Sequence, residues 1–150
     1  MKDYLALIHF IMQLSDELNR AYHIHPEIRI IFGAADENAV GGSCATLYHR
    51  DDMYIEVNLP WKQSYTTAIT GALTCLLIHE YAHYIWALKF TPAERTDDNQ
   101  KYLNDTTFRR NDEYRTWTHT KKMLKDLGYW NSAIRKSCLT FSYSWAMKEK

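Results

Sequence analysis

The sequence predicts an α+β fold in a single domain covering residues 1–150, with an N-terminal helix, a small antiparallel sheet and three helices after the sheet. Three observations support this prediction. The chain begins with apolar residues at helical spacing, continues with short segments in which apolar and polar residues alternate, and from about residue 68 returns to long segments of helical spacing.

The N-terminal segment Asp3–Tyr22 is predicted to be an amphipathic helix. It stops before His25-Pro26, because the residue preceding a proline avoids the helical conformation. No small-x-small cleavage site follows its apolar run, so we do not interpret the run as a secretion signal. The apolar stripe consists of Leu7, Ile11, Leu14 and Leu18.

Three strands are predicted between residues 27 and 58. Glu27–Phe32 is rich in isoleucine and is followed by a loop over 33–42, which has glycine at both ends. Ser43–Tyr48 and Met53–Asn58 are expected to form a hairpin around residues 49–52. In the second hairpin strand Met53, Ile55 and Val57 should face one way, and Tyr54, Glu56 and Asn58 the other.

Three helices are predicted in the second half of the chain. The first covers Ala68–Phe90, is capped by Thr66 or Thr67, and is terminated by Thr91-Pro92. The polar segment Ala93–Thr107 is expected to be a loop with some helical turns. The second helix covers Phe108–Leu127, where Gly128 stops it, and in the last helix Ile134, Cys138, Phe141 and Trp145 share one face.

Composition limits the function classes. The chain has 18 basic and 18 acidic residues, whereas proteins that bind nucleic acid by neutralising phosphates normally carry a basic excess, so we do not expect nucleic acid as the main partner. The apolar run 68–78 is too short to span a membrane. The three cysteines, an odd number at wide spacing, are expected to be reduced, which favours a cytoplasmic location.

The segment His79-Glu80-Tyr81-Ala82-His83 carries the strongest chemical signal. Histidines four residues apart on a helix project from the same face, near enough for both imidazoles to bind one zinc ion. The intervening Glu80 can take a proton from a water on the metal without being a ligand. Because buried ionisable groups cost free energy unless something holds them, we predict a zinc site with Glu80 as general base.

A catalytic zinc site needs a third protein ligand, and we predict Glu113. Glu113 aligns with Trp117, Leu124 and Leu127, the apolar stripe of its helix, whereas Asp112 aligns with Thr116, His119 and Met123, a more polar side. Trp86 and Lys89 stand where a metzincin would have glycine and histidine. The rival third ligands are Asp112, His119, Asp97, Asp98 and Cys44.

His-Glu-x-x-His on one helix with a glutamate on the next resembles the gluzincins, and the small size, the hairpin and the tyrosine-rich motif are most similar to the ImmA/IrrE-type minimal metallopeptidases. The resemblance covers roughly residues 43–127. It implies a zincin-like fold and a zinc metallopeptidase that cuts a protein or peptide substrate. Family members often carry a DNA-binding module, for which this chain has no room.

The same resemblance implies that the strand Met53–Asn58 is an edge with which a substrate peptide pairs, through Tyr54, Glu56 and Asn58. Two alternatives stay open: a peptide deformylase-like hydrolase with Cys44 as third ligand, and a non-catalytic, zincin-shaped module that binds protein. Five side chains qualify as the group that stabilises the oxyanion, namely Tyr102, Tyr114, Arg109, Arg115 and His119.

Overall fold

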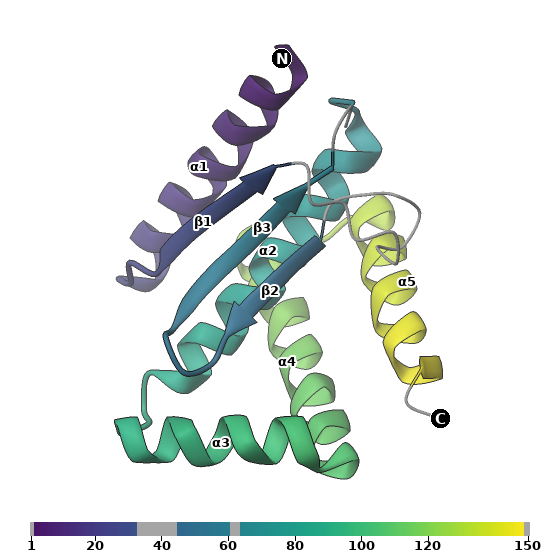
Figure 1. Cartoon of the computed structure of the whole chain (residues 1–150). Coiled ribbons are helices and arrows are strands. Elements are labelled where there is room, and N and C mark those ends of the chain that lie inside the picture. Colours follow the sequence, from purple (N-terminus) through teal and green to yellow (C-terminus); the bar gives the residue numbers. More distant parts are fainter. Residues whose placement is uncertain (1, 33–44, 61–63, 149–150) are drawn as a thin grey trace.

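The computed structural model describes residues 2–32, 45–60 and 64–148, with side chains from residue 3 to residue 142. These residues form five helices and a three-stranded sheet, so the predicted α+β class is confirmed (Figure 1). In chain order the elements are α1 (Lys2–Tyr22), β1 (Glu27–Phe32), β2 (Ala45–His49), β3 (Tyr54–Leu59), α2 (Thr67–Ala87), α3 (Pro92–Asn104), α4 (Thr106–Asp126) and α5 (Ser132–Lys148).

Helix α1 packs its apolar stripe into the core, as predicted. Leu7, Ile11, Leu14 and Leu18 are each at most 4% exposed, which places one continuous face of the helix against the rest of the molecule. The helix ends at Tyr22, as predicted, and the next residue, His23, adopts a left-handed conformation. A stop at this point leaves Glu27 free to begin the first strand.

The sheet has the order β1-β3-β2 and is mixed, so the prediction of an antiparallel sheet is wrong. Strands β2 and β3 form the predicted antiparallel hairpin, whereas β1 pairs in parallel with β3. The hairpin reverses the chain, so that β3 runs in the direction of β1. Met53 belongs to the turn, with a positive φ of 55°, and the strand begins at Tyr54.

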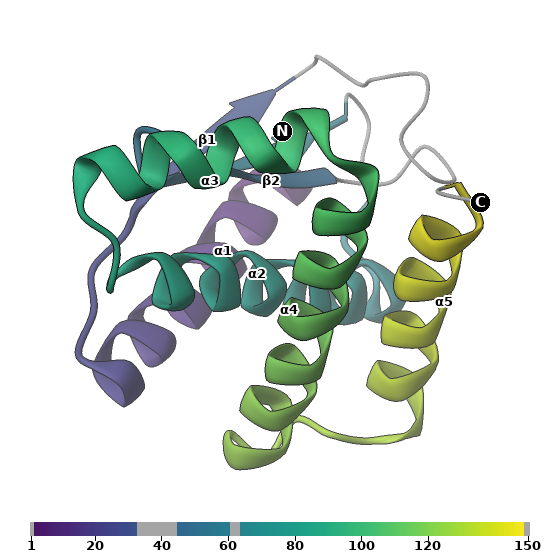
Figure 2. The same ribbon diagram turned by 90° about the horizontal axis from the view of Figure 1, so that it is seen from below.

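Helix α2 is the central element of the fold. It lies between the sheet on one side and helices α4 and α5 on the other, and it also contacts α1 (Figures 1 and 2). The predicted cap is confirmed, because the Thr66 hydroxyl accepts a hydrogen bond from the backbone N–H of Ile69. Because α2 is surrounded, eleven of its residues are buried, including His79, Glu80 and His83.

Helix α3 lies where the sequence predicted a loop. Thr91 and Glu94 form a capping box, in which the Thr91 hydroxyl accepts from the Glu94 N–H and the Glu94 carboxylate accepts from the Thr91 N–H. Pro92 occupies the first turn, where a proline costs no hydrogen bond. The pair Thr91-Pro92 therefore starts a new helix, and α2 ends earlier, at Ala87.

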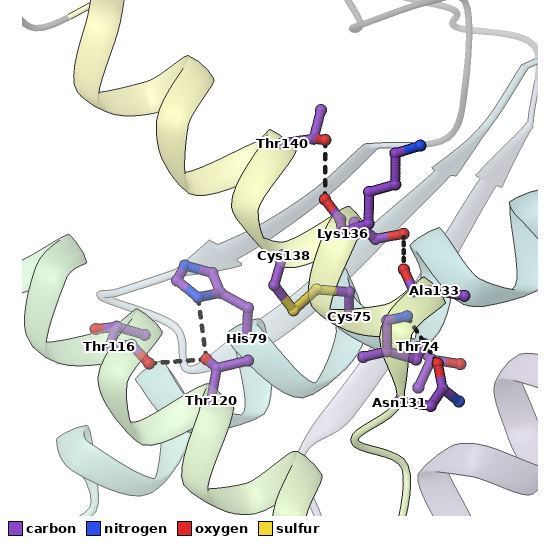
Figure 3. The surroundings of a disulfide bond; sticks show 12 residues. Thr74, Cys75, His79, Thr116, Thr120, Asn131, Ala133, Lys136, Cys138 and Thr140 are labelled. Carbon is purple, nitrogen blue, oxygen red and sulfur yellow. Dashed lines mark hydrogen bonds between the residues drawn. A yellow bond between two sulfur atoms is a disulfide. The ribbon is translucent and has the colours of Figure 1, made fainter.

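Helix α4 crosses α2 at a steep angle (Figure 2), and Gly128 with φ 79° stops it as predicted. Helix α5 packs on α2 through Ile134 and Cys138, both buried. Cys138 forms a disulfide with Cys75 of α2, so the prediction of reduced thiols is wrong for these two residues (Figure 3). The wide spacing in sequence hid a Cα–Cα distance of 6.1 Å.

The disulfide removes the argument from the cysteines for a reducing compartment. Across the part of the chain that the structure describes, no helix is both long enough and apolar enough to cross a membrane. The predicted loop 33–42, together with Ser43 and Cys44 at the start of the predicted hairpin, lies outside the described residues.

Candidate metal centre

The three predicted metal ligands come together in the core. His79 and His83 lie one turn apart on α2, and α4 brings Glu113 against both of them. The Glu113 carboxylate lies between the rings, with Oε2 2.9 Å from His79 Nε2 and Oε1 3.2 Å from His83 Nε2. One ligand atom from each residue lies within 4.8 Å of the others. This group can bind a metal ion.

Within this cluster, hydrogen bonds to the Glu113 carboxylate outweigh the cost of burying its charge. All three side chains are buried, with at most 7% of each residue exposed. Burial by itself raises the pKa of Glu113, but the hydrogen bonds of His79 and His83 to its carboxylate outweigh burial and hold the pKa well below its usual range. Glu113 is therefore ionised, as a metal ligand must be.

Glu80 follows His79 on α2 but is held by a different partner. Its carboxylate accepts a hydrogen bond of 3.1 Å from the Thr46 hydroxyl on β2. Burial raises the pKa of Glu80 to about 7, since the ionised form loses its hydration. A carboxyl group with this pKa can accept and return a proton near neutral pH.

A pocket of about 250 Å³ opens onto the cluster. It lies between β2, α2, α4 and the helices α3 and α5, and it combines polar groups with an apolar wall. The lining residues are Thr46, Leu47, Tyr48, Arg50, Leu76, His79, Glu80, His83, Tyr102, Glu113, Trp117 and Phe141. Glu80 and the three predicted metal ligands therefore share one cavity.

Asp112 lies beside His83, on the Nδ1 side of the ring. It receives hydrogen bonds from Arg50 at 2.6 Å and from Arg115 at 2.5 Å, and its Oδ2 lies 3.7 Å from His83 Nδ1. Asp112, Thr116 and Met123 are all buried, so the more polar side of the helix on which Asp112 was predicted also faces the interior. The positive charges of Arg50 and Arg115 offset the cost of burying the Asp112 carboxylate.

The remaining rival ligands do not join the cluster among the described residues. Asp98 pairs with Arg50 at 2.8 Å, and the exposed Asp97 pairs with Lys101. His119 does not line the pocket. Cys44 lies outside the described residues.

Of the five candidates for stabilising an oxyanion, Tyr102 alone lines the pocket within the described part of the chain. Its hydroxyl donates a 2.6 Å hydrogen bond to Glu113 Oε1. Burial, followed by the nearby Glu113 charge, raises the pKa of Tyr102, so the phenol stays a donor. Tyr114 is 76% exposed, and Arg109 donates to backbone carbonyls at the end of α3.

The strand expected to receive a peptide has both of its edges occupied. β3 is the central strand, paired with β1 and β2, so its backbone cannot take up another strand. The alternation is as predicted, with Ile55 and Val57 buried. Tyr54, Glu56 and Asn58 consequently lie on the face turned away from α2, so the prediction of substrate binding at a free β3 edge is wrong.

A scan against protein-family models, a search of curated proteins and a search of solved structures each return no match for this chain. The site therefore has to be interpreted from its own geometry. The residues that sequence reasoning missed include Thr46, Arg50, Thr116 and Thr120. The two threonines of α4 follow Glu113 at helical spacings of three and seven, which was a detectable signal, whereas Arg50 stands in a turn and gave none.

Proposed function

We propose that the chain is a minimal zinc metallopeptidase that hydrolyses peptide bonds in a protein substrate. The observation that carries this proposal is the position of Glu80, a buried carboxyl group in the same pocket as the His79–His83–Glu113 cluster but held by Thr46. A site that only holds a structural metal gains nothing from another buried acid beside it, and burial of that acid costs free energy.

The donor set supports zinc as the metal. Two imidazoles and one carboxylate are the ligands of open catalytic zinc sites, which keep a further position for water or substrate. Bound there, zinc would polarise a carbonyl group and make water a nucleophile near neutral pH. A zinc-binding helix beneath a small sheet also agrees with the zincin-like fold expected from the resemblance to gluzincins.

The side chains around the cluster have distinct roles in this proposal. Glu80 accepts a proton from the attacking water and passes it to the leaving amine, a task suited to its pKa of about 7. Tyr102 lines the pocket with its hydroxyl donating to Glu113, and to stabilise the oxygen that gains negative charge it would transfer this single hydrogen bond from Glu113 to that oxygen. Trp117 and Phe141 form an apolar wall that limits access of water.

The outer strand β2 supports a peptide as the substrate. Within the described residues β2 pairs with β3 on one side only, so its other edge can accept an added strand. Thr46, Leu47 and Tyr48 of β2 line the pocket, and Leu47 is 51% exposed. A peptide paired with β2 would thus run alongside the cluster, which transfers the substrate role from β3 to β2.

Metal content tests the ligand set. Elemental analysis of the wild type, Glu113→Ala and Cys44→Ala should find about one zinc per chain in the wild type and in Cys44→Ala, and loss of zinc in Glu113→Ala. Retention of zinc in Glu113→Ala with loss in Cys44→Ala would replace the proposal by the deformylase-like alternative.

Peptidase activity is tested with cell extract. Wild type, Glu80→Gln and the control Glu27→Gln, which changes an exposed glutamate on β1, are incubated with extract, and new protein termini are identified by mass spectrometry. Termini should appear with wild type and Glu27→Gln but not with Glu80→Gln. If no terminus depends on Glu80 while the zinc-loaded protein captures a specific partner, the non-catalytic binding module is the better explanation.

A further inference from the structure

Two threonines of α4 contact the metal-binding histidines on the side away from Glu113. Thr120 Oγ1 lies 3.2 Å from His79 Nδ1, and Thr116 Oγ1 lies 3.3 Å from His83 Nδ1 (Figure 3 shows the first pair). Both threonines are buried, with 0% and 2% exposed surface. Each histidine therefore has its Nε2 directed at Glu113 and its Nδ1 directed at a hydroxyl group.

The hydrogen of each threonine hydroxyl already takes part in a hydrogen bond to a backbone carbonyl. Thr116 donates a 2.7 Å hydrogen bond to the backbone carbonyl of Asp112. Thr120 donates one of 2.7 Å to the carbonyl of Thr116, which Figure 3 shows. A hydroxyl has one hydrogen, so toward the histidine ring its oxygen can only accept. The hydrogen between each threonine and its histidine must therefore sit on Nδ1.

This hydrogen position decides which ring nitrogen can bind metal. The hydrogen that each Nε2 donates to Glu113 in the metal-free protein is the one that a metal ion would replace, because the hydrogen on Nδ1 is held by the threonine oxygen and the Nε2 atom is the one directed at Glu113. We propose that Thr116 and Thr120 are positioning residues that fix the Nδ1–H tautomer of His83 and His79, so that both Nε2 atoms are available to a metal ion. The inference rests on the metal site of the proposed function.

The His79 pair is the better one to test, because His83 has more neighbours. His83 Nδ1 also lies 3.5 Å from an Arg50 nitrogen and 3.7 Å from Asp112 Oδ2. That nitrogen of Arg50 carries two hydrogens and donates one to Asp112 at 2.6 Å, so its second hydrogen competes with Thr116 for His83 Nδ1. For His79, the Trp117 ring stacks on the imidazole at 4.0 Å between centroids, which fixes the ring plane with Nδ1 toward Thr120.

Three variants separate the hydroxyl from the packing. Thr120→Val keeps the shape and removes the hydroxyl, and Thr120→Ser keeps the hydroxyl and removes the methyl group. Thr118→Val is the matched control, because the Thr118 hydroxyl makes the same bond to a carbonyl four residues earlier but is exposed and faces no histidine. Zinc affinity is measured by competition with a chelator, and helicity of the metal-free proteins by circular dichroism.

We expect Thr120→Val to weaken zinc binding about 10- to 100-fold, the usual effect of removing a hydrogen bond to a metal-binding histidine. Thr120→Ser and Thr118→Val should stay near wild type. A second measurement needs no variant: nitrogen-15 NMR of the zinc-loaded wild type should find the His79 proton on Nδ1 and the metal on Nε2.

The outcomes are distinguishable. Wild-type affinity in Thr120→Val, an equal loss in Thr120→Ser, or a proton on Nε2 of His79 would overturn the role of the threonines while leaving the metal site intact. Failure of the wild type to bind zinc would instead refute the proposed function, and the inference with it.

Discussion

Replacement of Glu80 by glutamine should make the metal-free protein more stable at neutral pH, although it removes the proposed catalytic base. Burial raises the pKa of Glu80 to about 7 from an ordinary value of 4.5, so the fold favours the protonated form. The stability associated with this proton is fully present below pH 4.5 and is lost as the pH rises through 7. A shift of this size corresponds to about 3 kcal/mol.

Glutamine carries no charge at any pH and keeps an oxygen that can accept the Thr46 hydrogen bond, so the variant avoids this loss. The free energy of unfolding is measured by urea titration of chelator-treated wild type and Glu80→Gln at pH 5 and pH 8. Relative to wild type, the variant should be favoured by about 1 kcal/mol at pH 5 and about 3 kcal/mol at pH 8.

The exposed variant Glu27→Gln provides the reference for loss of a surface carboxylate. The pH dependence isolates ionisation from any constant effect of the substitution, because that constant is the same at both pH values. An equal difference between Glu80→Gln and wild type at pH 5 and pH 8 would refute the reasoning. It would mean that Glu80 is as well solvated in the fold as in the unfolded chain.

Three further perturbations test other parts of the structure. Tyr102→Phe should retain zinc but lower the cleavage rate about 10²- to 10³-fold, measured on a substrate found in the extract experiment; an unchanged rate would exclude the tyrosine as oxyanion donor. Arg50→Ala leaves the buried Asp112 with Arg115 alone and should cost about 3 kcal/mol in urea unfolding, whereas a cost near zero would show the pair to be unimportant. Reduction of the Cys75–Cys138 disulfide, which closes a loop of 63 residues, should cost about 4 kcal/mol, with Cys138→Ser insensitive to reductant.

The parts of the fold that could be predicted from sequence depend on short spacings. The stripe of α1, the hairpin of β2 and β3, and the cap of α2 are each specified by residues fewer than fifteen positions apart. The pairing of His79 with His83 also follows from the helical repeat alone. Glu113 was predicted across a longer interval, because a carboxylate in line with an apolar stripe is costly unless it has a partner.

The misses have physical causes of two kinds. The order of the strands and the Cys75–Cys138 disulfide depend on which distant segments meet, and spacing in the sequence carries no such information. Helix α3 was missed because it has no buried residue and therefore no apolar repeat, and its capping box at Thr91 and Glu94 was the signal that local reasoning should have used.

The residues that contact the predicted metal ligands or their neighbours, such as Arg50 and Tyr102, were harder to predict than the ligands themselves. Arg50 reaches Asp112 from a turn on the opposite side of the pocket, across 62 positions of sequence. Tyr102 could be named only as one of five equal candidates, because the helix that aims it at Glu113 was expected to be a loop.

Helix α4 holds Glu113, Thr116 and Thr120 on a single face, so the three are set by one helical register. One residue inserted between Lys125 and Leu127 would leave their mutual positions unchanged, whereas one inserted between Glu113 and Thr116 would turn the carboxylate about 100° away from the two hydroxyls. The chain can therefore vary in length beyond the end of this helix, but between its metal-binding and histidine-positioning residues it can change only by substitution.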